Sequence, residues 1–315
     1  ASNPAVLDAV EKNHKKLQIA MTKLYPGNLV LSLSSGIMYH RLVDRITALN
    51  DVPREPLVPR RLGKNMCVPF GKILRGKVVP NTVTKTLHTD KVYEPDLNSF
   101  TIEPFPYYSP LKSQIETIKS FDRPVILVDD LVHTANRLQV LVPQLREDGI
   151  PIKKVVVGVL SGYGRDLMQC LKVPVESIYS MPNLRQWFVE STLYPFIGGD
   201  TVRREEMKVA GLQPSINMIL PYATPRLSGC SREALVEFSA CCIENSRDLF
   251  QVLEAEYRKM YAKNLTLSRL SEAVILPLCP DKGSCMEYDE NLAASVYLEN
   301  DLETLWRMKE FLIKG

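Results

Sequence analysis

The chain has 315 residues, of which 45% are hydrophobic and 24% are charged, and its formal net charge at pH 7 is +3. This composition excludes a disordered chain, because ample apolar surface is available for a sizeable core. No apolar run reaches the roughly 18 residues that a membrane-spanning helix needs, and the length allows one large domain or two ordinary ones.

The first residues, ASNPAVLDAVEKNHKK, contain no apolar signal core and no lipidation motif. Seven cysteines without a secretory signal favour reduced thiols, so we expect a cytoplasmic protein without a membrane association. Cys279 and Cys285 enclose a loop that could be bridged or could hold a metal. With four histidines and no CxxC pair, we expect two small side chains at a turn and no protein metal site.

The amino-terminal third predicts the opening of an α/β unit. Apolar residues recur with helical spacing over residues 4–24, and Pro26–Gly27 ends this pattern. Residues 28–34 predict a short buried strand, and residues 37–49 predict an amphipathic helix after a turn of small residues. A strand, a small-residue turn and a helix in this order are typical of an α/β fold.

The next stretch predicts a second strand over residues 65–70 and then an excursion from the sheet. Residues 78–93 and 99–107 are rich in Val, Thr and Tyr, with a turn-like segment between them. We expect these two segments to pair antiparallel outside a parallel sheet. A helix is expected over residues 109–121.

The middle of the chain gives the clearest pattern of alternating elements. Strands are predicted over residues 124–128, 153–160 and 173–180, with an amphipathic helix over residues 136–148 that Gly149 ends. Alternation of strands and helices at this spacing predicts a doubly wound parallel sheet.

From about residue 211 the pattern becomes mostly helical, and it predicts helices over residues 231–250, 252–263, 267–274 and 302–313. We therefore divide the chain into an α/β domain, residues 1–210, and a mostly helical carboxyl-terminal region, residues 211–315. Because the helix from residue 231 is apolar on more than one face, we expect this region to pack on the α/β domain.

The charge is distributed unevenly. Between Arg54 and Lys91 nine Lys or Arg residues face two acidic ones, so this stretch carries a charge of +7 and the rest of the chain is acidic. Such a local excess points to anions, either the phosphates of a small molecule or a nucleic-acid backbone. A solvated surface is the alternative interpretation.

The stretch VILVDDLVHTANRL, residues 125–138, combines two features of a ligand site. A buried strand delivers the adjacent carboxylates of Asp129 and Asp130 to the carboxyl edge of the sheet, where open α/β folds bind ligands. A short loop then enters a helix whose first amides can bind a phosphate. Carboxylates accept hydrogen bonds from vicinal hydroxyls, so the two halves together suit a ribose 5-phosphate.

This stretch resembles the phosphoribosyl-pyrophosphate loop of the type I phosphoribosyltransferases, where two acidic residues, two apolar residues and one variable residue precede Thr-Gly-Gly-Thr. The resemblance extends over about residues 25–205. It implies that Asp129 and Asp130 bind the ribose hydroxyls, and that the 5-phosphate is wrapped by His133, Thr134, Ala135, Asn136 and Arg137. Ala135 and Asn136 stand where glycines are usual, and Arg137 replaces the closing Thr.

The same resemblance implies further site residues. The small-residue turn Ser34–Ser35–Gly36 would contact pyrophosphate, and the basic stretch would donate the catalytic cations, with Lys72 and Lys85 as candidates. Tyr163, in the turn after the next strand, would face the acceptor, although this segment also fits a plain turn. The aromatic-rich residues 186–199 fit either a hood over the acceptor or ordinary core.

The predicted fold class is therefore a parallel α/β sheet flanked by helices, with a small antiparallel hood and a mostly helical carboxyl-terminal region. The resemblance implies a phosphoribosyltransferase, a glycosyltransferase that uses Mg²⁺ with phosphoribosyl pyrophosphate and an unknown, possibly nitrogenous, acceptor. The alternative is an inactive regulatory module that senses nucleotides or phosphoribosyl pyrophosphate. A nucleic-acid partner is less favoured, a homo-oligomer is left open, and the Asp pair could instead only cap a turn.

Overall fold

A computed structural model describes residues 3–52, 61–105, 108–203, 215–225, 227, 229–270, 277 and 288–314. The chain forms two compact units. The helical unit comprises residues 1–32, 92–100 and 188–315, and the sheet unit comprises residues 33–91 and 101–187. Cys279, Cys285, Arg54 and Arg60 lie outside the described residues.

The sheet unit is built on five parallel strands in the order β2-β1-β5-β6-β7. Their bounds are β1 Met66–Pro69, β2 Val83–Thr84, β5 Val125–Val132, β6 Ile152–Ser161 and β7 Val175–Met181. The parallel sheet predicted from the alternation of strands and helices is confirmed.

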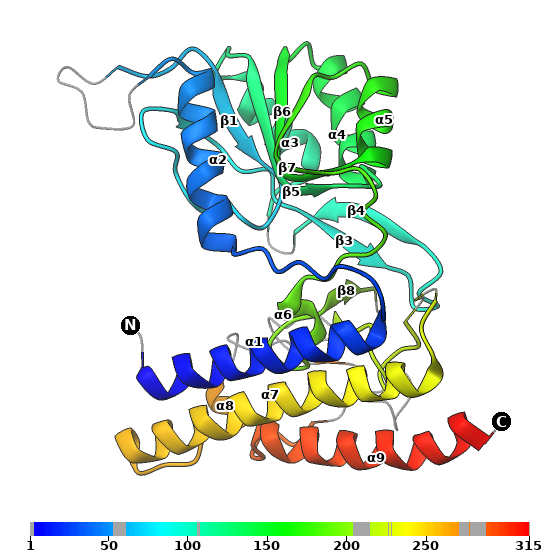
Figure 1. Ribbon diagram of the computed structural model, residues 1–315. Helices are drawn as coiled ribbons and strands as arrows, with labels where there is room; N and C mark the ends of the chain where they lie inside the picture. Colours follow the sequence, from blue (N-terminus) through cyan, green and yellow to red (C-terminus); the bar gives the residue numbers. More distant parts are fainter. Residues whose placement is uncertain are drawn as a thin grey trace. The chain divides into compact units, whose positions relative to one another are not determined.

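Helices cover both faces of this sheet (Figure 1). On one face α2 (Ser35–Leu49) packs against alternate residues of β5 such as Ile126 and Val128. On the other face lie α3 (Leu111–Lys119), α4 (Asn136–Glu147) and α5 (Gly162–Cys170). Side chains along a strand alternate between the two faces of a sheet. A strand that is covered by helices on both faces therefore needs an unbroken apolar run.

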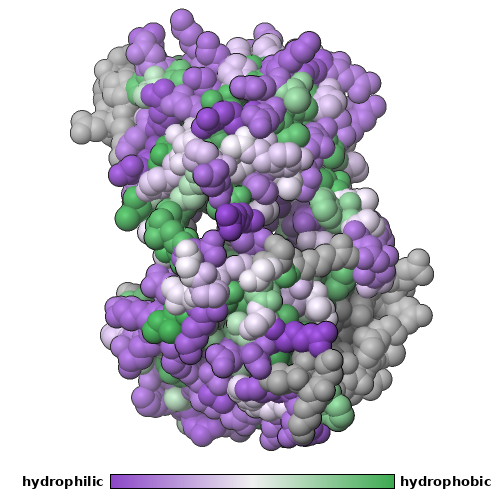
Figure 2. Space-filling view, turned by 45° about the vertical axis from the view of Figure 1, so that its right-hand side comes forward, coloured by the Kyte–Doolittle hydropathy of each residue, from purple (hydrophilic) through white to green (hydrophobic). Residues whose placement is uncertain are grey.

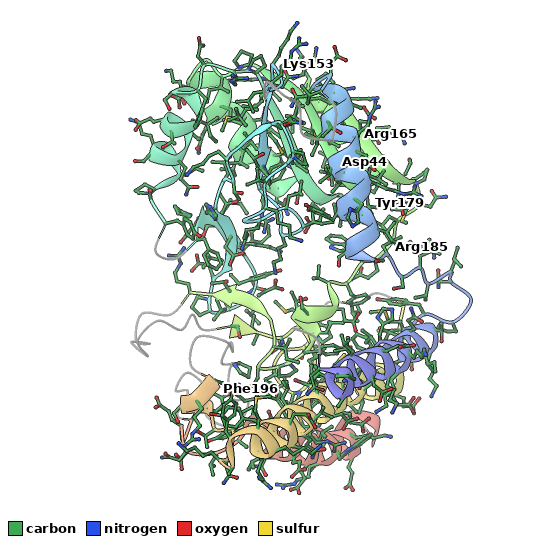
Figure 3. The ribbon with its side chains drawn as sticks, turned by 90° about the vertical axis from the view of Figure 1, so that its left-hand side faces the viewer. Asp44, Lys153, Arg165, Tyr179, Arg185 and Phe196 are labelled. Atoms are coloured by element: carbon green, nitrogen blue, oxygen red, sulfur yellow. The ribbon has the colours of Figure 1, made fainter. Side chains whose placement is uncertain are left out.

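Side chains of β7 also take part in the packing of α2. Tyr179, labelled in Figure 3, lies beside this helix, and the Arg41 guanidinium of α2 lies 5.7 Å from the centre of the Tyr179 ring. Such a cation placed over an aromatic ring is attracted to it. This contact stabilises the packing of β7 against α2.

A second, mixed sheet has the order β4-β3-β8-β9. Its strands are β3 Thr89–Tyr93, β4 Phe100–Pro104, β8 Asp200–Val202 and β9 Ser215–Ile216; β3 pairs parallel with β8, and β8 antiparallel with β9. The amide of Phe105 donates to the His88 carbonyl and that of Glu94 to the Ser99 carbonyl, which gives β3 and β4 the antiparallel pairing that was expected.

Two predictions about strands need correction. Val83–Thr84, inside the expected antiparallel excursion, pairs parallel with β1 at the edge of the main sheet. Residues 28–34 form no strand, because they pair with neither sheet, and Leu29 and Leu31 stay 83% and 57% exposed. An apolar run makes a buried strand only where a sheet edge is available to receive its backbone hydrogen bonds.

The helical unit is dominated by three long helices that lie side by side (Figure 1). These are α1 (Pro4–Leu24), α7 (Arg232–Tyr261) and α9 (Ala294–Lys314); α6 (Glu190–Leu193) and α8 (Leu267–Leu270) are short. The two helices expected over residues 231–263 are thus one continuous helix. The helix expected from residue 302 begins at Ala294.

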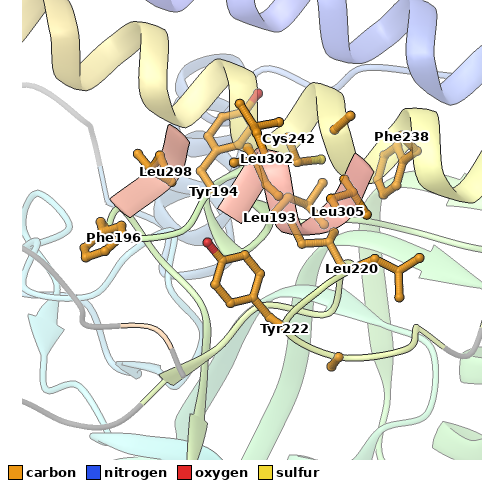
Figure 4. Packing of buried hydrophobic residues seen from close by; sticks show 14 of the residues in the cluster. Leu193, Tyr194, Phe196, Leu220, Tyr222, Phe238, Cys242, Leu298, Leu302 and Leu305 are labelled. Carbon is orange, nitrogen blue, oxygen red and sulfur yellow. The ribbon is translucent and has the colours of Figure 1, made fainter. Parts of the chain in front are cut away.

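α7 is apolar on several faces because it packs against both α1 and α9. Figure 4 shows Phe238 and Cys242 of α7 among Leu302 and Leu305 of α9 and Tyr194. This packing joins α1 to the carboxyl-terminal helices. A helix from the beginning of the chain thus supplies one wall of the same core as the carboxyl-terminal helices.

Asn13 of α1 and Asn245 of α7 connect these two helices through a buried, reciprocal pair of hydrogen bonds. The side-chain amide of Asn13 donates to the Asn245 carbonyl at 2.7 Å, and that of Asn245 donates to the Asn13 carbonyl at 2.9 Å. We expect Asn13→Ala to lower the free energy of unfolding by about 1–3 kcal/mol, because a buried carbonyl loses its donor. The exposed control Lys12→Ala should change it by less than about 0.5 kcal/mol. Urea unfolding checks both, and equal midpoints for the two variants would contradict this account.

Among the described residues, none of the helices combines the length and the apolar character that crossing a membrane requires. In the view of Figure 2 hydrophilic residues cover most of the described surface, and hydrophobic residues form small patches among them.

Candidate functional site

Asp129 and Asp130 lie within the second half of β5, which continues to Val132 before the chain turns. Asp129 is buried and is paired in register with Val157 of β6. The amide of Asp130 donates a hydrogen bond of 2.8 Å to Oδ1 of Asp129. The predicted Asp pair is therefore part of the sheet, near its carboxyl edge, with one of the two carboxylates withdrawn from water.

The environment of Asp129 disfavours its charge. Burial, and next the neighbouring charge of Asp130, raise the pKa of Asp129 to about 7, although the charges of Arg137 and Arg75 act in the opposite direction. A buried carboxylate with a like charge beside it is costly to keep, so it marks a candidate functional position.

The loop after β1 contacts the Asp pair directly. The amides of Lys72 and Ile73 donate to the two carboxylate oxygens of Asp130 at 3.1 and 2.8 Å. A Cβ added to Gly71 would lie 2.1 Å from Oδ1 of Asp129 and 2.7 Å from Oδ1 of Asp130. Only glycine allows this close approach. The contact that Lys72 makes with the pair is thus through its backbone, whereas the sequence suggested a role for its side chain.

The loop after β5 and the start of α4, residues 133–137, are called the cradle below. Ala135 precedes α4 in a left-handed conformation, with φ 51° and ψ 21°, and it offers no side-chain cap to the helix. The side-chain amide of Asn136 donates to the hydroxyl of Thr134 at 2.9 Å, which braces the turn. Since the first amides of a helix need acceptors and carry the positive end of its dipole, this 12-residue helix presents them at the end of β5.

Arg137 lies in the first turn of α4, close to the Asp pair. Its guanidinium donates to the carbonyl of Phe70 at 3.4 Å and lies 4.0 Å from the carboxylate of Asp90. Its charge also acts on Asp129. The structure thereby brings together the loop after β1, the Asp pair and the cradle, which come from two neighbouring strands.

His133 and Tyr163 also meet at this edge of the sheet. Nδ1 of His133 lies 2.8 Å from the hydroxyl of Ser161, which accepts from the amide of Gly164 and caps α5. The His133 ring lies 5.7 Å from Tyr163 and 5.1 Å from Trp187, measured between ring centres. The Ser161–Gly164 segment is thus the first turn of a helix, with the exposed Tyr163 ring beside His133.

For the aromatic-rich residues 186–199 the sequence allowed two interpretations, a hood over the acceptor or ordinary core, and the aromatic residues of this segment differ in their environment. Trp187 is partly exposed and faces His133, whereas Tyr194 and Phe196 are buried in the core of the helical unit.

Ser34–Ser35–Gly36 lie where α2 begins, and the hydroxyl of Ser34 accepts from the amide of Ile37. One turn further on, Met38 packs beside Gly158 of β6, since a Cβ added to Gly158 would lie 2.1 Å from the Met38 sulfur and 2.6 Å from the Asp130 carbonyl oxygen. The amino end of α2 therefore approaches β5 and β6 near the Asp pair, although no strand precedes it.

Lys85 is not brought to the Asp pair by any contact that the structure describes; its charge acts instead on His88, whose pKa is lowered by burial and by the charges of Arg75 and Lys85. Arg75 belongs to the same basic stretch, from which the sequence singled out only Lys72 and Lys85 as candidate cations. Its Nη2 donates to the Thr89 carbonyl at 3.2 Å, and its buried Nε has no hydrogen-bond partner among the described residues. Its position in the basic stretch was the available signal.

The described residues include no group of three or more His, Cys, Asp or Glu side chains that could hold a metal ion. The Asp pair offers carboxylate oxygens, which Mg²⁺ prefers, and Mg²⁺ is commonly held by one or two carboxylates together with substrate phosphates. The donor set fits a Mg²⁺ ion that arrives with a phosphorylated ligand.

Comparisons with known proteins found no matching family model and no matching curated protein. Solved structures of three phosphoribosyltransferases are similar to about half of the chain. The purine enzyme of Pyrococcus horikoshii Ot3 is 13% identical, with 50% of this chain and 97% of that chain covered and a TM-score of 0.30. The hypoxanthine enzyme of Trypanosoma cruzi is 17% identical, with 50% and 80% covered and a TM-score of 0.29. The adenine enzyme of Thermoanaerobacter pseudethanolicus is 9% identical, with 52% and 99% covered and a TM-score of 0.27.

Proposed function

We propose that the carboxyl edge of the parallel sheet binds the ribose 5-phosphate group of phosphoribosyl pyrophosphate, and that the protein transfers this group to a nitrogenous acceptor. The observation that supports this best is the juxtaposition, within one strand-turn-helix segment, of the Asp pair and the uncapped amino end of α4. A ribose phosphate needs acceptors for its hydroxyls and donors for its phosphate, and this segment offers both.

The Asp pair would accept hydrogen bonds from the ribose 2- and 3-hydroxyls. Both oxygens of Asp130 already accept backbone amides from the loop after β1. Each carboxylate oxygen has a second lone pair, so Asp130 can bind this loop and a hydroxyl at the same time. The loop would thereby hold the carboxylate in one orientation before the ligand arrives, which reduces the cost of ordering it.

The 5-phosphate would lie in the cradle of residues 133–137. The amides at the start of α4 donate to phosphate oxygens, and the Arg137 guanidinium adds a fixed positive charge where the hydroxyl of a Thr would be weaker. The left-handed Ala135 forms the turn that comes directly before these amides, a backbone shape found in anion-binding concavities.

Transfer would break the bond between C1 of the ribose and the pyrophosphate oxygen and form a bond from C1 to an acceptor nitrogen. Ser34–Ser35–Gly36 at the amino end of α2, with Lys72 and Lys85, would offset the charge of the departing pyrophosphate. Mg²⁺, held by the carboxylates and the ligand's phosphates, would neutralise part of that charge. Tyr163, whose ring lies beside that of His133, would contact a planar acceptor by stacking.

A regulatory module that binds the same ligand without turnover is the second candidate. Two observations favour it, because both concern the candidate catalytic cations. Lys72 contacts Asp130 through its backbone amide, and the charge of Lys85 acts on His88. Neither candidate cation makes a side-chain contact with the Asp pair in the structure's described residues.

We expect phosphoribosyl pyrophosphate with Mg²⁺ to raise the melting temperature of the protein, because a ligand that binds only the folded state stabilises it. At a ligand concentration 100 times Kd the stabilisation is about 2.7 kcal/mol. Arg137→Ala should abolish most of the shift, whereas Arg146→Ala, an exposed arginine in the last turn of the same helix, should keep it. No shift in the wild-type protein at millimolar ligand would contradict both candidate functions.

Pyrophosphate release separates the two candidates. The protein is incubated with phosphoribosyl pyrophosphate, Mg²⁺ and a panel of nucleobases, and pyrophosphate is measured. Release that depends on one base and on Asp129 supports transfer, whereas a thermal shift without release for any base favours the regulatory module.

A further inference from the structure

The helical unit contains a second group of polar side chains, which the ribose-phosphate proposal does not use. Nε2 of His14, on α1, lies 3.1 Å from the hydroxyl of Ser32, and Nδ1 of the same ring lies 2.7 Å from a carboxylate oxygen of Glu190. A hydroxyl, an imidazole and a carboxylate in this order are the three parts of a serine nucleophile site, which is recognised by geometry and roles and recurs on unrelated folds.

We propose that Ser32, His14 and Glu190 form a nucleophilic site that hydrolyses small aliphatic carboxylic esters. Ser32 is the nucleophile, His14 is the general base, and Glu190 is a positioning residue. All three residues belong to the helical unit.

The hydrogen bonds of His14 set its tautomer. In the neutral imidazole, a bond from Nδ1 to the Glu190 carboxylate puts the proton on Nδ1 and the lone pair on Nε2, because an ionised carboxylate only accepts. Nε2 lies 3.1 Å from the hydroxyl of Ser32 and 2.9 Å from the side-chain amide of Gln18. It has a single lone pair, so Ser32 replaces Gln18 as its donor in the reactive state. This is the arrangement in which an imidazole removes the proton of a serine hydroxyl.

Glu190 is itself held by a partly buried network. The phenol of Tyr194 donates to the other oxygen of Glu190 at 2.9 Å, and the side-chain amide of Asn245 donates to the Tyr194 oxygen at 3.2 Å. Burial, followed by the charge of Glu190, raises the pKa of Tyr194, so the phenol remains a donor. A carboxylate fixed in this way keeps the imidazole in one orientation.

The surroundings of Ser32 indicate the kind of substrate. Ser32 is exposed, and its neighbours along the chain, Leu29 and Leu31, are 83% and 57% exposed. These apolar side chains beside an accessible hydroxyl suit an aliphatic acyl group. Gln18, which contacts the same ring nitrogen as Ser32, offers an amide N–H to the oxygen on which negative charge develops.

In the reaction the Ser32 oxygen attacks the ester carbonyl carbon while His14 takes the hydroxyl proton. The carbon–oxygen bond to the alcohol then breaks, and the alcohol leaves with the proton from His14, so Ser32 carries the acyl group. Water attacks this acyl group with His14 again as base, which releases the carboxylic acid and restores the Ser32 hydroxyl.

The test combines hydrolysis of p-nitrophenyl butyrate with labelling by a fluorophosphonate and location of the label by peptide mass spectrometry. We expect the label on Ser32, and we expect Ser32→Ala to abolish both labelling and turnover. His14→Gln should slow both by at least about 100-fold, the range that general-base catalysis supplies. Glu190→Gln should slow turnover while ligand-induced stabilisation by phosphoribosyl pyrophosphate stays unchanged.

Ser191→Ala, an exposed serine next to Glu190, is the matched control and should behave as the wild type. Circular dichroism confirms that each variant is folded; the exposed position of Ser32 makes Ser32→Ala the variant least affected in stability. Absence of label on Ser32 in the folded wild-type protein would overturn the proposal. Equal rates in the wild type and in Ser32→Ala would do so too.

Discussion

Asp129→Asn is expected to make the protein more stable at pH 8 and at the same time to weaken ribose-phosphate binding at least about tenfold. The pKa of Asp129 is raised to about 7 from its ordinary value of 3.8, mainly by burial, so the folded protein holds this proton more tightly than the unfolded chain does. The Asp129 contribution to stability is therefore favourable at low pH and is lost as the pH rises from about 4 to about 7. At pH 8 the charge is fully present and destabilises the fold.

The amide that this substitution introduces would keep the shape of the side chain and an oxygen that accepts from the Asp130 amide. It would remove the buried charge, so we expect a gain of about 1–3 kcal/mol at pH 8 and almost none near pH 4. Urea unfolding at the two pH values measures this gain. The exposed control Asp166→Asn should show no such difference. A variant that is less stable at pH 8 would mean that the charge of Asp129 supports the fold rather than a ligand.

Gly71→Ala is expected to have the largest effect of any single methyl group added to the site. The new Cβ would lie 2.1 Å from Oδ1 of Asp129, far inside van der Waals contact. The carboxylate of Asp130, 2.7 Å away, cannot retreat easily because the amides of Lys72 and Ile73 hold it. We expect a loss of about 2–4 kcal/mol in the free energy of unfolding together with the loss of ligand binding.

Gly76→Ala, in the same loop, is the matched control. Gly76 has φ +70° but nothing lies within 4 Å of an added Cβ, so this variant carries only the backbone cost of about 1 kcal/mol. Denaturant unfolding of both variants separates steric conflict with the Asp pair from backbone strain. If Gly71→Ala were no more destabilising than Gly76→Ala, the close contact between this loop and the carboxylates would be contradicted.

The elements of the sheet could be predicted from the sequence because each carries its own pattern. The apolar run before Asp129 needs burial on both faces, and this requirement alone identifies a central parallel strand. Residues 28–34 have a similar apolar character, yet Leu29 stays exposed. What decides between the two cases is a free sheet edge, and such an edge is a property of the whole fold.

The site could be predicted only where its residues are neighbours in the chain. The Asp pair and residues 133–137 are contiguous, so one motif indicates them together. Gly71 joins them only because β1 and β5 are adjacent strands of the sheet, although the chain separates them by dozens of residues. His14, Ser32 and Glu190 are scattered across the first and second halves of the chain, and no spacing in the sequence connects them.

Titration calorimetry with ribose 5-phosphate tests the central claim most directly, because this ligand contains the hydroxyls and the phosphate but no pyrophosphate. We expect the wild-type protein and Arg146→Ala to bind it with equal affinity. Asp129→Asn should weaken the contacts with the ribose hydroxyls, and Arg137→Ala should weaken those with the phosphate. We expect each substitution to raise Kd at least about tenfold, because each removes one charged hydrogen bond. Unchanged affinity in both variants, or no binding by the wild-type protein at millimolar concentration, would contradict the placement of a ribose phosphate at the end of β5.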